Sequence, residues 1–291
     1  MLSIEPFSFI CRLQPKGVLM FWVNGVPQTQ VSLGDRSFQY GDGCFTTIQT
    51  KNGELEYWQA HVERLEACLK TLHIPLPDWS IVSEWAHLAT LKDEHAGIKI
   101  HISRGIGGRG YGTKGIEGPM VTISNFAFPV HYVDWQQNGV NLGVCEARLG
   151  IQPLLAGHKH NNRLEQVLAK AEIEHSNFAD AVTLNVQNHV IETTMANLFW
   201  VKDNKVYTPS LNLSGVAGVM RRKVLEFFEA NNTEVEVGDF SLMELLSADE
   251  VWMCNSLLGV APVTSITAAN NHKTVFPIGK LTQRLQGNLN T

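Results

Sequence analysis

The chain has 291 residues, 44% of them hydrophobic and 18% charged, which is typical of a globular protein with one large domain or two modest ones. The formal net charge is −5 and the sequence has no basic stripe, so no nucleic-acid partner is expected. No apolar run reaches the length of a membrane span, so no membrane partner is expected either.

The five cysteines are widely spaced and never form a C-x-x-C pair. This pattern argues against a disulfide framework and a zinc ribbon, and it favours the reducing cytoplasm as the location. Cys145 and Cys254 lie in apolar runs and are expected in the core. Residues 1–19 lack a basic first segment and a cleavage site, so we interpret them as an N-terminal extension, either an upstream start or a loosely attached tail, and not as a signal peptide.

The first half predicts strands with two helices, in the style of an α+β fold. Strand signals come from alternation and turn residues, and helix signals from apolar residues three and four apart. We expect a strand and turn over residues 20–28, a hairpin over 44–58, helices over 60–72 and 79–91, and strands over 97–105 and 119–128. These elements form a small α/β domain over residues 20–126.

Residues 127–138 lose clear periodicity and contain a proline, so a linker between domains is expected there. The remaining residues, 139–291, predict a larger β-rich domain with packed helices. We expect strands over 139–150, 180–186, 189–195, 197–203, 205–210, 249–256 and 259–266, and helices over 163–175, 215–232 and 241–248.

A glycine-rich segment, GIGGRG at residues 105–110, matches the spacing of a dinucleotide-binding loop. Such a loop must open a helix, whereas here more glycines and then a strand follow, so we reject a dinucleotide site. The segment is either a flexible hairpin loop or a substrate-binding loop. In the second case Arg104, Arg109 and Tyr111 are candidate ligands for substrate carboxylates, because arginine forks suit carboxylates.

The stretch GHKHNN at residues 157–162 offers two readings. His158 and His160 could bind a metal ion, but no third and fourth ligand has suitable spacing, so no metal is expected. Lys159 could be a solvated surface residue. Buried near a cofactor aldehyde, however, it would have a lowered pKa and could form a Schiff base.

That second reading requires a phosphate site and a carboxylate for a pyridine nitrogen. Arg64 lies on one helix face and could bind a phosphate, and the small residues at 215–219 open a helix whose amides favour an anion. Glu192 lies in a strand pair downstream of Lys159 and could hold a pyridine nitrogen protonated. Each signal alone is weak, so the interpretation rests on the order in which these signals follow one another along the chain.

Seven segments in this order resemble the fold-type IV pyridoxal-phosphate enzymes, a group of branched-chain and D-amino-acid aminotransferases and aminodeoxychorismate lyases. They are DRSFQYGDGCFTT, HVERL, SRGIGGRGY, HKHNNRLEQVLA, ETTMANLFW, GVAGVMRR and MCNSLLGVAPV. The resemblance implies a two-domain fold, a homodimer with its active site between the domains and near the dimer interface, and pyridoxal 5'-phosphate as cofactor.

The resemblance also implies residue roles. Lys159 would carry the cofactor as an internal aldimine and act as the proton-transfer base, Glu192 would face the pyridine nitrogen, and Arg64 would bind the phosphate. The amides around Val219 and Met220, with Asn255 or Ser256, would complete the phosphate site.

Within this group the sequence looks most like the lyases. Thr46, a candidate substrate-binding residue, stands where the aminotransferases commonly carry a glutamate. The implied reaction converts 4-amino-4-deoxychorismate to 4-aminobenzoate and pyruvate for folate biosynthesis, and an amino-acid aminotransferase is the alternative. His158 and Asn161 depart from the aliphatic residues expected beside the lysine.

Overall fold

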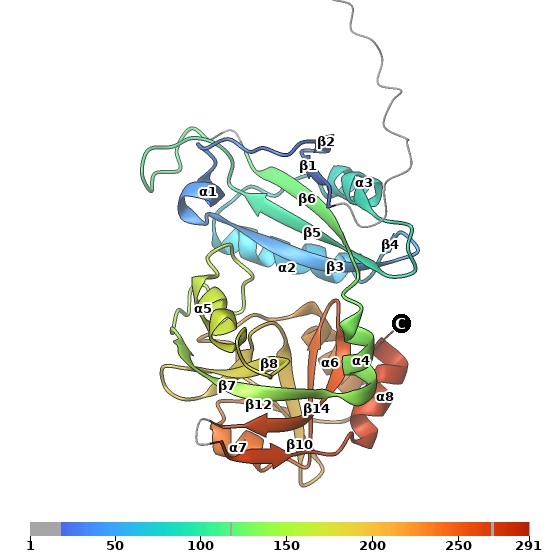
Figure 1. Ribbon diagram of the computed structural model, residues 1–291. Helices are drawn as coiled ribbons and strands as arrows, with labels where there is room; N and C mark the ends of the chain where they lie inside the picture. The colour runs from blue at the N-terminus through green and yellow to red at the C-terminus, as the bar shows by residue number, and fades with distance from the viewer. Residues whose placement is uncertain (1–18, 117, 269–270, 291) are drawn as a thin grey trace, which may run out of the picture.

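The computed structural model describes residues 19–116, 118–268 and 271–290. The predicted extension, residues 1–19, therefore lies outside the described part of the chain except for its last residue. Figure 1 shows two bodies, each built on its own sheet, joined near α4. Together they confirm the expected α+β fold.

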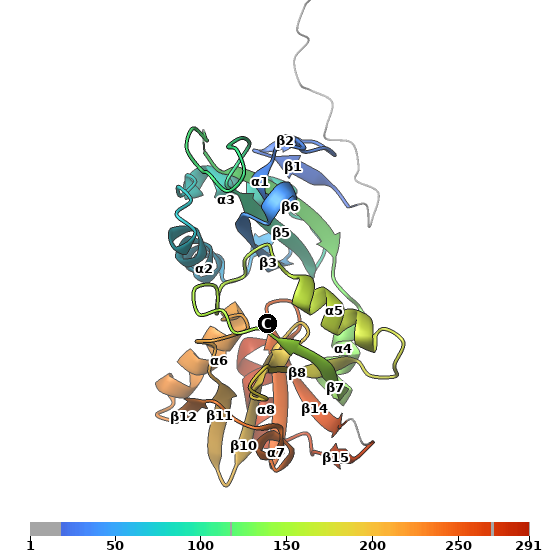
Figure 2. The same ribbon diagram turned by 90° about the vertical axis from the view of Figure 1, so that its left-hand side faces the viewer.

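The upper body contains a six-stranded antiparallel sheet in the order β2-β1-β6-β5-β3-β4. Its elements are β1 (Phe21–Val23), β2 (Val26–Pro27), α1 (Arg36–Tyr40), β3 (Gly43–Lys51), β4 (Glu54–Leu55), α2 (Trp58–Thr71), α3 (Trp79–Ala89), β5 (Ala96–Ser103) and β6 (Met120–Ala127). The hairpin expected around Asn52-Gly53 is present between β3 and β4. Helices α2 and α3 cover one face of this sheet, as Figure 2 shows.

The lower body contains a nine-stranded mixed sheet in the order β12-β11-β10-β13-β14-β7-β8-β9, with β15 paired to β14. Its elements are α4 (His131–Asn138), β7 (Val140–Leu149), α5 (Leu164–Ile173), β8 (Asp180–Asn185), β9 (Val190–Thr193), β10 (Asn197–Lys202), β11 (Lys205–Pro209), α6 (Val219–Ala230), β12 (Val235–Gly238), α7 (Leu242–Leu246), β13 (Glu250–Asn255), β14 (Gly259–Thr267), β15 (Lys273–Val275) and α8 (Lys280–Leu289). The strands and helices expected in this half are present.

Some elements differ from the sequence-based expectation. The segment predicted as a linker contains helix α4, where Tyr132 packs into the large core although the segment has no clear period. Helices α1 and α8 were not expected, because α1 has five residues and α8 contains an internal glycine. Helix α1 is held by its caps, Asp35 and Gly41, whereas α4 and α8 pack Tyr132 and Leu285 into the cores of the large domain.

Each sheet has its own hydrophobic core. In the small domain the core lies between the sheet and the helices α2 and α3. In the large domain one core lies under α4 and α7, and another lies between the sheet and the helices α6 and α8. Cys145 and Cys254 are buried, as expected for small core residues.

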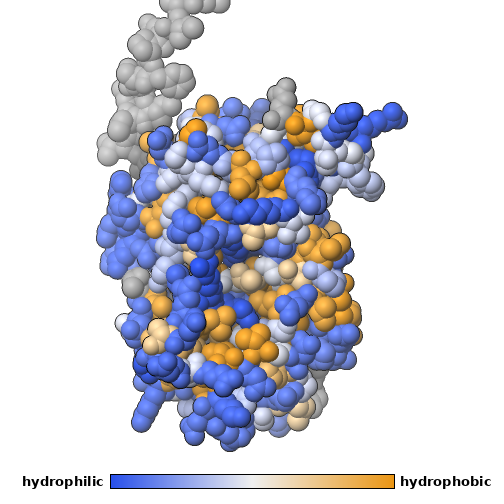
Figure 3. Space-filling model, turned by 180° about the vertical axis from the view of Figure 1, so that it is seen from behind, coloured by the Kyte–Doolittle hydropathy of each residue, from blue (hydrophilic) through white to orange (hydrophobic). Residues whose placement is uncertain are grey.

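One face of the molecule carries no large patch of a single kind of residue. Figure 3 shows hydrophilic and hydrophobic residues interspersed over both domains on the face opposite to that of Figure 1. Within the described ranges, every helix is too short or too polar to cross a membrane.

Candidate active site

A cavity of about 340 Å³ lies between the two domains. The cavity brings together Arg64, Lys159 and Glu192, although 128 positions of the sequence separate the first of these residues from the last. Both Asn255 and Ser256 also line it. The remaining lining residues are Phe45, Thr47, Tyr132, Arg163, Gln166, Thr194, Met195, Ala196, Asn197, Val216, Gly218 and Leu257.

The segment that carries Lys159 is hydrogen-bonded to both domains. On the small-domain side, the Phe45 amide donates to Lys159 O at 3.0 Å and the Asn161 amide donates to Gly43 O at 2.9 Å. On the large-domain side, the Gly157 amide donates to Gly215 O at 3.0 Å. The lysine therefore stands where the edge of one sheet meets a loop of the other domain.

Arg163 holds the backbone on both sides of the lysine. Its Nε donates to His160 O and its Nη2 donates to His158 O, each at 2.8 Å. The His158 ring contacts Thr71 Oγ1 at 3.0 Å, on the last turn of α2. The two residues that depart from the family pattern thus make contacts between the domains: His158 reaches α2, and Asn161 Nδ2 donates to Ser37 Oγ at 2.8 Å.

The environment of Lys159 favours the neutral amine. Burial is the largest cause that lowers its pKa, and the positive charges of Arg64 and Arg163 lower it further. The negative charge of Glu192 acts in the opposite direction. The resulting pKa is about 7, so a large share of Lys159 carries a free electron pair at neutral pH.

Glu192 is 6% exposed and lies on β9. Its Oε2 accepts hydrogen bonds from the Val216 amide at 3.0 Å and from Asn197 Nδ2 at 3.4 Å. Burial raises the pKa of Glu192 to about 7, against the opposing effects of the Val216 amide and Lys159. This carboxyl group is therefore suited to share a proton with a ring nitrogen placed beside it.

Arg64 lies on α2, and Thr46 holds it from β3. Arg64 Nη2 donates to Thr46 Oγ1 at 2.5 Å, and His61 Nδ1 lies 2.6 Å from the same oxygen. Because an arginine side chain can only donate hydrogen bonds, the Thr46 hydroxyl oxygen accepts from Arg64. The Thr46 hydroxyl proton is then free to be donated to His61. Arg64 Nε is buried without a hydrogen-bond partner in the described structure, so this donor is available to a ligand.

Thr46 itself does not line the cavity. It is fully buried, because alternate residues of β3 point toward α2, whereas Phe45 and Thr47 point toward the other domain. In our interpretation Thr46 acts by holding Arg64, and Thr47 is the threonine that faces a substrate.

The N-terminus of α6 adjoins the cavity. Gly218 is the N-cap and lines the cavity, and the first-turn residues Val219 and Met220 are buried. Amides in a first turn have no acceptor within the helix, so they can bind an anion. A Cβ at Gly218 would collide with Asn197 Oδ1, which explains a glycine at this position.

Asn255 is the last residue of β13, and Ser256 begins the turn that follows. Asn255 Oδ1 accepts from the amides of Leu257 and Leu258 at 2.9 and 2.8 Å, so this side chain shapes the turn. Of the residues predicted for cofactor binding, five line this one cavity, and Val219 and Met220 follow its lining residue Gly218 directly in the sequence.

The residues predicted to bind substrate carboxylates are placed elsewhere. Arg104 forks onto Asp42, with Nε–Oδ2 at 2.7 Å and Nη2–Oδ1 at 3.0 Å, and it also donates to the carbonyls of Leu72 and His73. All three of its nitrogens are engaged, so Arg104 holds the end of α2 to β5. Arg104 does not line the Lys159 cavity, and these contacts engage four of its five N–H groups.

Arg109 and Tyr111 lie on the loop between β5 and β6, which packs on α1. Arg36 Nη1 donates to Gly110 O at 3.0 Å, and the rings of Tyr40 and Tyr111 are 5.6 Å apart. Tyr111 is 88% exposed. Neither Arg109 nor Tyr111 lines the Lys159 cavity of its own chain.

Sequence reasoning missed several cavity residues. Tyr132 comes from α4, in the segment predicted as a linker, and its hydroxyl lies 3.4 Å from Met195 Sδ. Asn197 and Arg163 lie inside motifs that were quoted for the resemblance, yet they were given no role. The signal that could have found Arg163 is its position four residues after the lysine.

Metal binding gains no support from the structure. Among the described residues, no group of three or more His, Cys, Asp and Glu side chains could hold a metal ion. His158 instead contacts Thr71.

Comparisons with known proteins extend these observations. The family model for amino-transferase class IV matches residues 43–266. The aminodeoxychorismate lyase of Vibrio harveyi is 76% identical over 272 residues, covering 94% of this chain and 100% of that protein. The aminodeoxychorismate lyase of Bacillus subtilis (strain 168) is 30% identical over 260 residues, covering 86% and 88%.

A solved structure is also similar over almost the whole chain. The crystal structure of 4-amino-4-deoxychorismate lyase from Pseudomonas aeruginosa superposes with a TM-score of 0.85 at 38% identity, covering 92% of this chain and 97% of that one.

Proposed function

The chain belongs to the class IV aminotransferase family, and from this premise we propose that it is a pyridoxal-phosphate-dependent aminodeoxychorismate lyase. The reaction converts 4-amino-4-deoxychorismate to 4-aminobenzoate and pyruvate, which serves folate biosynthesis. The observation that carries the proposal is the single cavity where Lys159, Glu192, Arg64 and the start of α6 meet.

The cavity fits this cofactor in size and in chemistry. Its volume, about 340 Å³, lies in the range of small-molecule sites. Arg64 Nε has no partner in the described structure, and the first amides of α6 have none within the helix, so both can donate to a phosphate. Glu192 would face the ring nitrogen, and Lys159 would bind the aldehyde carbon. When bound, the cofactor supplies an electron sink for the pair released as a C–H bond breaks.

The residues of the chain then have defined tasks. Arg64 and α6 hold the phosphate end, and Glu192 shares a proton with the ring nitrogen. Lys159, whose amine burial shifts toward the neutral form, takes the proton from C4 of the substrate at its Nζ. The C3–O bond breaks, the enolpyruvyl group leaves and gains a proton to become pyruvate, and the ring becomes aromatic.

We also propose a cytoplasmic homodimer. The loop with Arg109 and Tyr111 lies away from the Lys159 cavity of its own chain, so these residues could bind a substrate carboxylate only in a second copy. In a dimer, the loop of each copy would reach the cavity of the other copy. Arg109 and Tyr111 would then bind the substrate in the partner's cavity.

The test is direct. The purified protein should be yellow, borohydride should fix the cofactor onto Lys159, and the protein should form 4-aminobenzoate from 4-amino-4-deoxychorismate. Lys159→Ala should abolish turnover, whereas Lys205→Ala, at an exposed lysine of β11, should not change it. A colourless protein that stays inactive with added pyridoxal phosphate would contradict the proposal. Sustained amino transfer to pyruvate or 2-oxoglutarate would favour an aminotransferase instead.

A further inference from the structure

Two helices from different domains meet beside the Lys159 cavity. Helix α2 of the small domain carries Arg64, and α6 of the large domain follows its N-cap Gly218. Both Arg64 and Gly218 line the cavity, and Figure 2 shows α2 above α6 on the same side of the molecule. In the proposed function these helices hold one phosphate from two domains. Their separation therefore determines whether both can reach it.

An ion pair joins the two helices next to these lining residues. Glu63 directly precedes Arg64 on α2. Arg222 lies four positions after Gly218 on α6. Arg222 Nη1 donates to Glu63 Oε2, and the other oxygen of this carboxylate accepts from Gln59 Nε2 at 3.1 Å. The pair is thus a direct, charged connection between the two domains.

The ion pair belongs to a network of charges on α6. Arg222 Nε donates to Glu226 Oε1 at 2.7 Å, and Lys223 Nζ donates to Glu226 Oε2 at 2.8 Å. Lys223 Nζ also lies 5.4 Å from the centroid of the Tyr57 ring, at the N-cap of α2. Exposed ion pairs contribute most where several charges form a network, and a cation over an aromatic face adds attraction.

Tyr57 shows that the start of α2 is held by the large domain. Its φ of 52° lies in the left-handed region, which is unfavourable for a residue with a Cβ atom, so surrounding contacts must stabilise it. The Tyr57 side chain packs against the core that lies between the large-domain sheet and the helices α6 and α8. The same pair of helices is therefore connected by packing as well as by charge.

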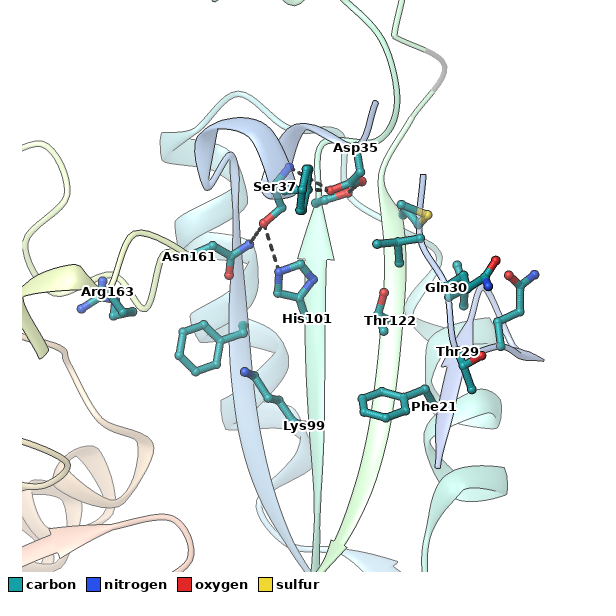
Figure 4. A pocket seen from close by; sticks show the side chains of 17 residues that line it. Phe21, Thr29, Gln30, Asp35, Ser37, Lys99, His101, Thr122, Asn161 and Arg163 are labelled. Atoms are coloured by element: carbon teal, nitrogen blue, oxygen red, sulfur yellow. Dashed lines mark hydrogen bonds between the residues drawn. The ribbon is translucent and has the colours of Figure 1, made fainter. Parts of the chain in front are cut away.

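The lysine segment provides a second connection between the domains, made of neutral groups. Asn161 Nδ2 donates to Ser37 Oγ at 2.8 Å, beside a second cavity of about 600 Å³ that both residues line (Figure 4). The side chains of Arg222 and Glu63 are 50% and 42% exposed. Salt screens such an exposed pair of charges far more than a neutral hydrogen bond, so salt distinguishes the two connections.

We propose that Glu63 and Arg222 are positioning residues for the phosphate site. Their ion pair holds α2 against α6, so that Arg64 and the first amides of α6 reach one phosphate together. This inference rests on the proposed function. Neither Glu63 nor Arg222 lines the cavity, so both act through the groups beside them. Because the ion pair and the phosphate hold the same two helices together, each should strengthen the other.

The test compares pyridoxal phosphate with pyridoxal, which lacks only the phosphate. Absorbance titration of cofactor-free protein gives the Kd of each ligand. Glu63→Gln and Arg222→Gln should each raise the Kd of pyridoxal phosphate by about twofold to fivefold, as expected for an exposed ion pair. The Kd of pyridoxal should not change, because this ligand does not bridge α2 and α6. The double variant should lose no more than either single variant, since all three lack the same contact.

Asp249→Asn is the matched control. It removes one charge of an exposed ion pair, Lys202–Asp249, that lies within the large domain, so it should leave both Kd values unchanged. At about 1 M salt, where the Debye length is about 3 Å, the difference between Glu63→Gln and the unchanged protein should disappear.

The outcomes separate this inference from the proposed function. If Glu63→Gln binds pyridoxal phosphate as tightly as the unchanged protein, loses both ligands equally, or keeps its deficit at high salt, the inference is overturned while the lyase reaction can stand. If the loss is selective but the protein forms no 4-aminobenzoate, the proposed function falls and the role of the ion pair stands. A protein that binds no pyridoxal phosphate would overturn both.

Discussion

At the scale of single residues, burial and neighbouring charges decide how Lys159 behaves. Burial lowers its pKa most, two arginines lower it further, and a single buried carboxyl group, Glu192, raises it. The balance leaves the amine near half protonation at neutral pH, which suits a group that must first attack an aldehyde and later carry a proton. Neither the histidines beside Lys159 nor a metal ion is needed for this effect.

The pH dependence of Lys159 follows from that balance. Its folded pKa, about 7, is below the ordinary value of 10.5, so the nucleophilic neutral form gains population as pH rises through 7. Cofactor-free protein should capture pyridoxal phosphate at a rate that increases about tenfold per pH unit below 7 and levels off above it. Stopped-flow absorbance would measure this. A rate that keeps rising to pH 10 would contradict the shifted pKa.

Glu192→Gln provides the matched variant for the same measurement. Removing the negative charge should move the midpoint of capture below that of the unchanged protein, because Glu192 is the group that raises the pKa of Lys159. Glu236→Gln, at an exposed position of β12, should leave the midpoint in place.

At the scale of elements, strand β3 shows how alternation assigns roles. Thr46 and Thr47 are neighbours of the same residue type, yet one is buried against α2 and the other lines the cavity. The sequence pattern could place both threonines on a strand, but it could not tell which face would meet the ligand, because both faces of β3 carry apolar and polar residues.

Valine substitutions at the two threonines separate these roles. Thr46→Val leaves Arg64 and His61 without their shared oxygen, so the free energy of unfolding should fall by about 1–3 kcal/mol. Thr47→Val removes a hydroxyl at the cavity wall and should cost less stability while changing KM. Urea unfolding of cofactor-free protein measures the first effect. Equal losses of stability at both positions would show that the faces of β3 are assigned wrongly.

At the scale of the whole molecule, the lysine segment joins the domains. Asn161 bonds to Gly43 and Ser37 of the small domain, and Gly157 bonds to Gly215 of the large one. These bonds hold the segment to both domains, so they position Lys159 relative to Arg64 of the small domain and Glu192 of the large one.

The proposed exchange of loops between two copies can be tested by mixing inactive variants. Lys159→Ala lacks the reactive amine, and Arg109→Ala lacks the loop arginine. If Arg109 acts on the partner's cavity, subunit exchange creates mixed dimers in which one cavity has both groups, and lyase activity should return. If activity stays at the level of the separate variants after exchange is verified by mass spectrometry, Arg109 does not act in this way.

The sequence by itself determined the fold class and most strands and helices, and it singled out three residues that line one cavity, Arg64, Lys159 and Glu192. Periodicity and turn residues sufficed for the elements, and the ordered motifs with Arg64, Lys159 and Glu192 sufficed for the resemblance. These signals are local, or are preserved in order along the chain, so they can be read without coordinates.

Only the tertiary structure decided which side chains meet. It placed Arg104 on Asp42 instead of in the cavity, brought Tyr132 in from α4, and brought Nζ of Lys99 and of Lys159 to 4.5 and 4.6 Å from the centroid of the Phe45 ring. The physical reason is that contacts between distant segments depend on strand register, on the face that each strand presents and on the packing of two domains. No single stretch of sequence encodes these three properties.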